Sequence, residues 1–204
     1  LVATDNVFSM DGDKANIKGI EKILNQKNAL LMQDDAHGFG IFNPMIPKHS
    51  IYMATLGKAA GVMGAFVAGD EDLIEFLIQK SRPYTYTTAI PPSFCNAILT
   101  SLKLIDNGEQ KEKLLTNISY FKSIASQLGL QFGISNSAIQ PLVIGSSSAA
   151  LKLSNQLFEE GFFVSAIRPP TVPPNTARLR FTLSANHTSQ QINKLLEKVK
   201  NVMA

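Results

Sequence analysis

The stretch Ala29-Leu30-Leu31-Met32-Gln33-Asp34-Asp35-Ala36-His37-Gly38 gives the clearest indication of the fold. A short apolar run that ends in polar residues is typical of a buried parallel strand. Residues 15–26, just before it, place their apolar side chains on one face of a helix. Residues 1–4 form another short apolar segment. Strand, helix and strand in this order predict a βαβ unit.

The same patterns continue along the rest of the chain. Further strands are predicted at residues 51–55, 65–68, 139–144, 162–167 and 177–183, and further helices at residues 70–80, 93–106, 109–128, 147–160 and 188–202. The helix at 70–80 is expected to begin with Asp70 as its cap. We therefore expect an α/β fold, with half of a large, mostly parallel sheet in residues 1–91. Connecting helices occupy residues 92–134, and a small α+β domain occupies residues 135–204.

Composition excludes several classes of function. The chain has 204 residues, 45% hydrophobic and 17% charged, with a net charge of +3, so it can bury a substantial core. Its basic residues are scattered rather than clustered, which argues against nucleic-acid binding. No apolar run is long enough for a membrane span. The single Cys95 excludes an internal disulfide and suits a reducing compartment, so a cytoplasmic protein is expected.

Asp34 and His37 follow a predicted parallel strand directly. Open α/β sheets bind ligands at the carboxyl ends of such strands, and an acid and a histidine three residues apart can point into one cavity. Asp34 or Asp35 could instead cap a following helix, and His37 could be an ordinary loop histidine. A metal site is not expected, because the three histidines, His37, His49 and His187, lack the spacing of metal ligands.

Thr55 and Lys58 follow the next predicted strand. A lysine after a glycine is most often a surface residue, but the neighbours of Lys58 are small and apolar, so we expect partial desolvation of its amine. A nucleotide-binding P-loop is rejected, because Ala59 stands where that motif needs Ser or Thr. Pyridoxal 5'-phosphate (PLP) chemistry needs a lysine for the aldehyde and a carboxylate for the pyridine nitrogen. Asp34, His37, Thr55 and Lys58 together could supply these groups.

Three segments together resemble successive motifs of the α-oxoamine synthases, PLP enzymes of the aspartate-aminotransferase fold (fold type I). They are residues 6–13 (Asn-Val-Phe-Ser-Met-Asp-Gly-Asp), 34–38 (Asp-Asp-Ala-His-Gly) and 55–59 (Thr-Leu-Gly-Lys-Ala). The resemblance covers nearly the whole chain and implies the C-terminal part of such an enzyme. Residues 166–180 are most similar to the branch that condenses L-alanine with a pimeloyl thioester, on CoA or acyl carrier protein. That acyltransferase reaction loses CO2 and gives 8-amino-7-oxononanoate for biotin biosynthesis.

The resemblance also implies roles for single residues around the cofactor. Lys58 would hold PLP as a Schiff base and would remove the Cα proton of the amino acid. Asp34 would pair with the pyridine nitrogen, and His37 would hydrogen-bond the phenolate oxygen. Ser9 would lie near the cofactor, and Thr55 would bind its phosphate.

Two further residues take roles from the resemblance. Arg180 would bind the carboxylate of the substrate, a task that suits the two-pronged guanidinium group; from its pattern alone it could be a surface residue of a strand. Residues 86–92 are similar to the segment that reaches the cofactor phosphate of the neighbouring subunit. This implies a homodimer and adds Thr88 to the cofactor-binding residues.

The chain departs from the family in two places. Only residues 39–50 separate the histidine motif from the lysine strand, where family members usually have a longer, glycine-rich loop. The family's N-terminal half, with its phosphate loop and the histidine that stacks on the ring, has no counterpart, so the chain alone is not expected to form a complete active site. Two alternatives remain: a sibling enzyme that uses glycine and acetyl-CoA (glycine C-acetyltransferase), or a non-catalytic subunit with the same fold.

Overall fold

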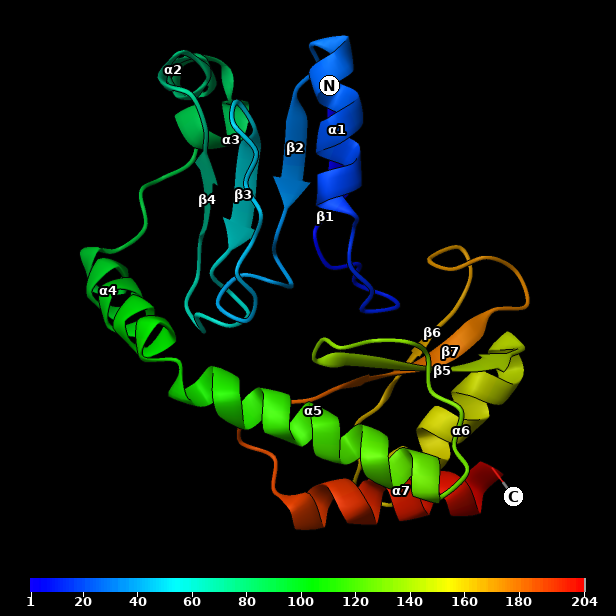
Figure 1. The fold of residues 1–204 in the computed structure, drawn as a ribbon. Helices are drawn as coiled ribbons and strands as arrows, with labels where there is room; N and C mark the ends of the chain where they lie inside the picture. Colours follow the sequence, from blue (N-terminus) through cyan, green and yellow to red (C-terminus); the bar gives the residue numbers. More distant parts are fainter. Residues whose placement is uncertain (204) are drawn as a thin grey trace. The chain divides into compact units, whose positions relative to one another are not determined.

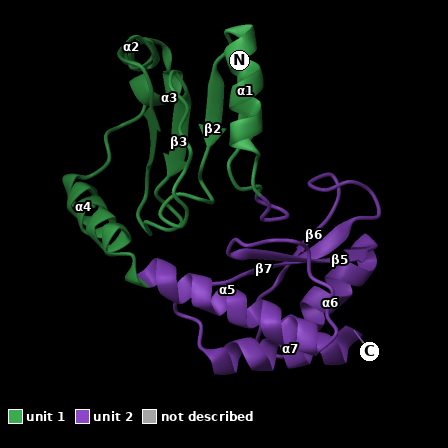
Figure 2. Cartoon of the chain, viewed as in Figure 1, with its two compact units in different colours: residues 1–8, 14–109 green, residues 9–13, 110–204 purple. Residues whose placement is uncertain are grey.

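The computed structural model describes residues 1–203 and forms two compact units (Figure 2). Unit 1 contains residues 1–8 and 14–109, and unit 2 contains residues 9–13 and those from Gln110 on. Of the two helices expected to connect the domains, α4 (Pro92–Asn107) belongs to unit 1 and α5 (Glu109–Gln127) lies almost wholly in unit 2. The division predicted from sequence has three parts, whereas the structure has two units with other boundaries. The three-part division therefore stays a prediction.

Unit 1 is built on a four-stranded sheet. The strands β1 (Val2–Asp5), β2 (Leu31–Asp34), β3 (Ile51–Thr55) and β4 (Ala65–Ala68) lie side by side in this order (Figure 1). The first three strands are parallel, and β4 is antiparallel to β3. With α1 (Ile17–Lys27) between β1 and β2, the predicted βαβ unit is confirmed.

Helix α1 is defined by its ends and by one apolar face. The Asn16 side chain accepts a hydrogen bond of 3.1 Å from the Gly19 amide at the N-terminus. At the C-terminus Asn28 adopts the left-handed conformation with φ 46°, which suits asparagine. Ile17 and Leu24 pack on Leu31 of β2, so the apolar face of the helix covers the sheet at the start of β2.

The second half of unit 1 is helical. It comprises α2 (Glu71–Lys80), the short α3 (Arg82–Thr85) and α4. Asp70 stands at the N-cap position of α2, but its side chain makes no capping hydrogen bond. The expected position of the cap is confirmed, while the Asp70 carboxylate accepts a 2.8 Å hydrogen bond from His49 in place of a helix amide. In α4, the Ser101 hydroxyl donates to the Ala60 carbonyl at 2.6 Å, which fastens the helix to the loop between β3 and β4.

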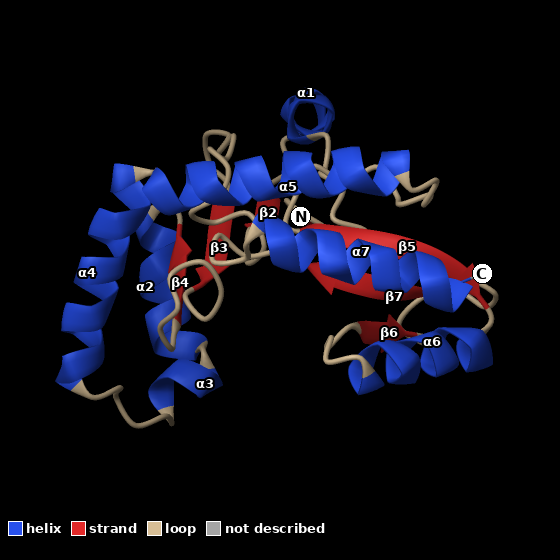
Figure 3. Ribbon diagram, turned by 90° about the horizontal axis from the view of Figure 1, so that it is seen from below, coloured by secondary structure: helices blue, strands red, loops and turns tan. Residues whose placement is uncertain are grey.

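Unit 2 is a three-stranded antiparallel sheet covered by helices. The strands β5 (Ile139–Gly145), β6 (Ser165–Ile167) and β7 (Ala177–Thr182) lie in the order β5-β7-β6. The helices α5, α6 (Ser147–Glu159) and α7 (Ser189–Met203) lie over one face of this sheet (Figure 3). The ring of Phe132 meets those of Phe121 and Phe181 edge to face, with centroids 4.8 Å from Phe121 and 5.2 Å from Phe181. These rings tie α5 to the central strand β7.

The opposite face of β7 holds a segment from far away in the sequence. Residues 9–13, which follow β1, lie in unit 2, where the Ser135 hydroxyl donates a 3.1 Å hydrogen bond to the Gly12 carbonyl. Gly12 has φ +70°, and a Cβ atom there would lie 2.5 Å from the Ser135 and Ser137 hydroxyls. Only glycine fits this place without a shift of the chain.

We predict that Gly12→Ala destabilises the protein by at least about 3 kcal/mol, because a positive φ and a steric clash act together. Gly129→Ala is the matched control: Gly129 has φ +76°, but a Cβ atom there meets nothing within 4 Å. The control is expected to cost only about 1 kcal/mol. Urea unfolding of both variants measures the difference, and equal losses would show that residues 9–13 are not closely packed.

Candidate active site

The carboxyl ends of three parallel strands bring acidic groups together in unit 1. The register of the sheet pairs Asp5 of β1 with Asp34 of β2, and Asp34 with Met53 of β3. Asp34 is half-buried, and one of its carboxylate oxygens accepts a 2.9 Å hydrogen bond from the Ala36 amide. No helix follows, so the expectation that Asp34 or Asp35 might cap one is not met. The residues after Asp34 form a turn that contains His37.

Lys58 lies in the tight loop between β3 and β4. Hydrogen bonds from the Leu56 amide to the Gly64 carbonyl (2.8 Å) and from the Gly61 amide to the Lys58 carbonyl (3.0 Å) close this loop. The Lys58 amine donates to the Thr55 hydroxyl at 3.5 Å, so the two residues lie at one end of β3 as expected. Lys58 is exposed. The expected desolvation of its amine is therefore wrong for this chain, because the small neighbouring side chains do not cover it.

Asp5 links the acidic and basic groups of this edge. Burial raises the pKa of the Asp5 carboxyl, and the negative charge of Asp34 raises it further, while the positive charge of Lys58 lowers it. The charges of both Asp34 and Lys58 therefore affect the pKa of Asp5. Asp5 was not among the residues predicted for the site, although it ends β1 as Asp34 ends β2, and that shared position was the available signal.

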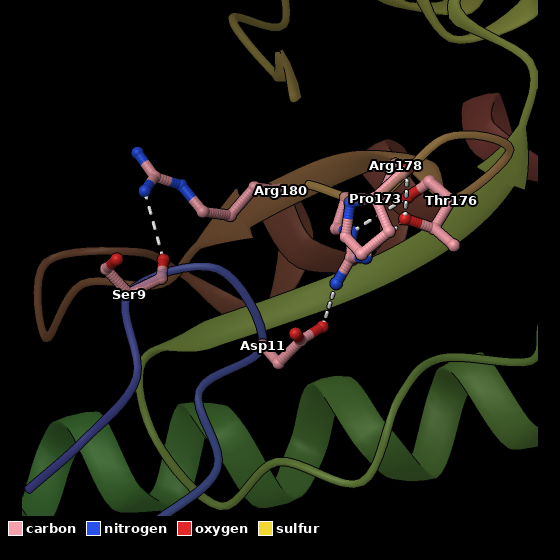
Figure 4. Close-up of polar contacts among 6 residues, drawn as sticks. All are labelled: Ser9, Asp11, Pro173, Thr176, Arg178 and Arg180. Carbon is pink, nitrogen blue, oxygen red and sulfur yellow. Dashed lines mark hydrogen bonds and ion pairs between the residues drawn. The ribbon is translucent and has the colours of Figure 1, made fainter. Parts of the chain in front are cut away.

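Arg180 and Ser9 meet in unit 2, where Arg180 donates a 3.1 Å hydrogen bond to the Ser9 carbonyl (Figure 4). The neighbouring Arg178 is buried and forms an ion pair with Asp11. Arg178 also donates to the backbone and side-chain oxygens of Thr176, at 3.1 and 3.2 Å. These contacts give Arg178 a structural role. By contrast, the Nε atom of Arg180 is buried and has no hydrogen-bond partner among the described residues.

The remaining expectations concern Thr88, metals and membranes. Thr88 lies in the exposed segment between α3 and α4. Within residues 1–203 the structure contains no cluster of three or more His, Cys, Asp or Glu side chains that could bind a metal. In the same residues, no helix has the length and apolar character that crossing a membrane requires.

The model of one protein family matches nearly all of the chain. This family is the class I and II aminotransferases, and the match covers residues 1–199. The chain belongs to this family. The α/β fold expected from the sequence is thereby confirmed, as is the expected aminotransferase fold.

The family members most similar in sequence include two curated 8-amino-7-oxononanoate synthases. The one from Hydrogenovibrio crunogenus is 49% identical over 97% of the chain and 53% of its own length. The one from Methylococcus capsulatus is 48% identical over 97% of the chain and 54% of its own length. The chain therefore spans about half the length of the curated relatives it matches. With the Saccharophagus degradans enzyme, 215 positions are compared although the chain has 204 residues, so that relative carries residues that the chain lacks.

Two solved structures of family members are also similar. Serine palmitoyltransferase from S. paucimobilis, solved with a bound PLP–myriocin aldimine, has a TM-score of 0.88 and 26% identity, covering 98% of the chain and 54% of the enzyme. The 8-amino-7-oxononanoate synthase from Francisella tularensis has a TM-score of 0.81 and 33% identity, covering 98% of the chain and 61% of the enzyme.

We predict that Asp11→Ala destabilises the protein by about 1–3 kcal/mol, because it leaves the buried Arg178 guanidinium without its counter-charge. The estimate is below that for a fully buried pair because Asp11 is half exposed. Asp13→Ala is the matched control, an exposed acid in the same segment, and should change stability by less than about 0.5 kcal/mol. Chemical unfolding compares them, and an equally small effect of both would mean that the ion pair adds nothing.

Proposed function

We propose that the protein catalyses the decarboxylating condensation of L-alanine with a pimeloyl thioester, on CoA or acyl carrier protein, to give 8-amino-7-oxononanoate in biotin biosynthesis. One observation carries the proposal: eight curated relatives, 45–49% identical over nearly the whole chain, all bear the name of the enzyme of this reaction. The chain covers about half of each relative, so the activity is proposed for the protein at its full length.

The groups at the sheet edge of unit 1 fit PLP by their chemistry. Lys58 offers an exposed amine for the aldehyde, and its neighbour Thr55 offers a hydroxyl for the phosphate. Asp34, held by the Ala36 amide, offers a carboxylate for the pyridine nitrogen, and His37 lies in the same turn. When bound, PLP supplies an electron sink for the carbanion of the substrate. Several solved neighbours contain PLP, which supports the same cofactor here.

The side chains of the chain itself divide the remaining work. The amine of Lys58 is proposed to remove the Cα proton of L-alanine and later to return a proton there, because an unprotonated amine accepts a proton and, once protonated, can return one. Arg180 is proposed to bind the alanine carboxylate. Its guanidinium donates to the Ser9 carbonyl through Nη1, and the planar group has further donors of the kind that bind a carboxylate.

The protein is proposed to act as a homodimer in the cytoplasm. Residues 86–92 are all exposed, and Thr88 lies among them. Such a segment is available to reach the cofactor phosphate of a partner subunit, as the motif resemblance implies. The single Cys95 fits a reducing compartment.

A sibling reaction is the second candidate. Serine palmitoyltransferase structures reach a TM-score of 0.88 with this chain, so the fold alone is compatible with another amino acid and another acyl group. A sibling that joins glycine and acetyl-CoA has the same requirements for Lys58, Asp34 and His37. The amino acid that changes the spectrum of the bound cofactor distinguishes the two candidates.

We predict that borohydride reduction of the full-length protein with PLP leaves a pyridoxyl group on Lys58. Lys58→Ala should lose the adduct, because alanine has no amine that could react with the aldehyde of PLP. Lys80→Ala is the control at another exposed lysine of unit 1 and should keep the adduct. Peptide mapping by mass spectrometry identifies the site.

The visible spectrum of the unreduced protein with PLP, recorded with L-alanine, glycine and L-serine, should change selectively with L-alanine. A response mainly to glycine would move the assignment to the sibling, and an adduct elsewhere would overturn it.

We predict that Arg180→Lys raises the KM for L-alanine by about 10–100-fold with a smaller change in kcat, because lysine cannot make the bidentate contact. Arg168→Lys, at an exposed arginine of the same unit, is the control and should leave both constants unchanged. Steady-state kinetics at varied L-alanine measures the effect. An unchanged KM for Arg180→Lys would exclude Arg180 from carboxylate binding.

A further inference from the structure

Behind the edge that carries Asp34 lies a buried carboxylate to which the proposed reaction assigns no role. Along β2 and the residue after it, Leu31, Gln33 and Asp35 point to the buried side and are at most 2% exposed. Asp34 points to the other side and is half-buried. The Asp35 amide still donates to the Met53 carbonyl of β3 at 2.8 Å, so Asp35 is the last residue that the sheet holds in place.

Polar groups from all three parallel strands surround Asp35. The Tyr52 hydroxyl of β3 donates to its carboxylate at 2.5 Å, and the Asn6 side chain, just after β1, donates to it as well. Gln33 of β2 donates in turn to the Asn6 amide oxygen at 2.9 Å. A buried carboxylate with this many partners is fixed in one orientation. Each of these partners lies in a different strand or directly after it, so the network joins the strands where they end.

The charges of this network agree with its geometry. Burial raises the pKa of Asp35, and its hydrogen bonds to Tyr52 and Asn6 oppose that rise. Burial and the neighbouring Asp35 both raise the pKa of Tyr52, so the phenol remains protonated and donates. The negative charge of Asp34 raises the pKa of Asp35 further, and the positive charge of Lys14 lowers it. Tyr52 is therefore the donor and Asp35 the acceptor in this hydrogen bond.

The same residue closes the turn that contains His37. The Asp35 carbonyl accepts hydrogen bonds from the Gly38 and Phe39 amides, at 3.1 and 2.9 Å. A Cβ atom on Gly38 would lie 2.2 Å from a carboxylate oxygen of Asp35, so the carboxylate occupies the space where a side chain would stand. Both the backbone and the side chain of Asp35 therefore define the path of residues 34–38.

We propose that Asp35 is a positioning residue, whose carboxylate holds the 34–38 turn so that Asp34 and His37 are presented to the cofactor ring. Asp34 and His37 lie one residue before and two residues after Asp35, in the turn whose path its carbonyl and carboxylate define. The inference rests on the proposed function, since it assumes that Asp34 and His37 bind PLP. Supporting residues that orient a binding group change affinity by about 10–100-fold in comparable metal sites.

The test is the dissociation constant of PLP, measured by titration of the full-length apo-protein and followed by the visible spectrum. Asp35→Ala and Gly38→Ala should each raise it by at least about tenfold and shift the visible band, because both displace the turn. Tyr52→Phe, which keeps the ring and loses only one donor, should raise it by about threefold. This milder variant keeps the test possible if the other two fail to fold.

Leu24→Ala is the control for a loss of stability alone. Leu24 is buried in the cluster between α1 and β2 and has no place in the network. It should lower the Tm without changing the dissociation constant or the visible band at a temperature where the protein is folded. If Tyr52→Phe and Asp35→Ala bind PLP as tightly as Leu24→Ala, the positioning role is refuted while the proposed function stands. If the unmodified protein binds no PLP, both are refuted.

Discussion

The parallel pairing of β1, β2 and β3 is the constraint on which the rest of unit 1 depends. Parallel strands all end at the same edge of a sheet, and the residues that follow them are therefore neighbours in space although they are far apart in sequence. This pairing places Asp5 beside Asp34 and puts Thr55 and Lys58 at the end of the next strand. The network of Asp35 joins the same three strands on the buried side, so one set of paired strands positions both Asp5 and Asp34 and the buried carboxylate beneath them.

Much of the fold could be predicted because apolar periodicity is a local property. The strands at residues 51–55 and 65–68 match β3 and β4, and the helix at 109–128 ends one residue beyond α5. The antiparallel direction of β4 had no signal in the sequence, since direction depends on the path of the connecting loop. The short helix α3 was missed, and β6 begins three residues later than expected. The assignment of residues 9–13 to unit 2 depends on contacts with residues more than a hundred positions away, such as Ser135.

The candidate site was predictable where the type of residue decides the chemistry and unpredictable where the surroundings do. Lys58, Asp34 and His37 stood out because few side chains can serve an aldehyde, a pyridine nitrogen and a phenolate. Asp35 could not be separated from Asp34 by sequence, because only the burial of one and the partial exposure of the other distinguishes them. The exposure of Lys58 was also missed, since small neighbours suggest shelter but do not by themselves cover an amine.

The passage of residues 9–13 through unit 2 has a consequence for the connectivity of the molecule. The backbone passes from one unit to the other after residue 8, after residue 13 and after residue 109. The two units are therefore joined by three covalent connections instead of one. A single cut near residue 109 would therefore not release two self-sufficient fragments: the N-terminal fragment would keep the five residues that fill the face of β7. Complementation from two separately expressed pieces thus requires the N-terminal piece to return this short segment, including Gly12 and Asp11, to the sheet from which it was divided.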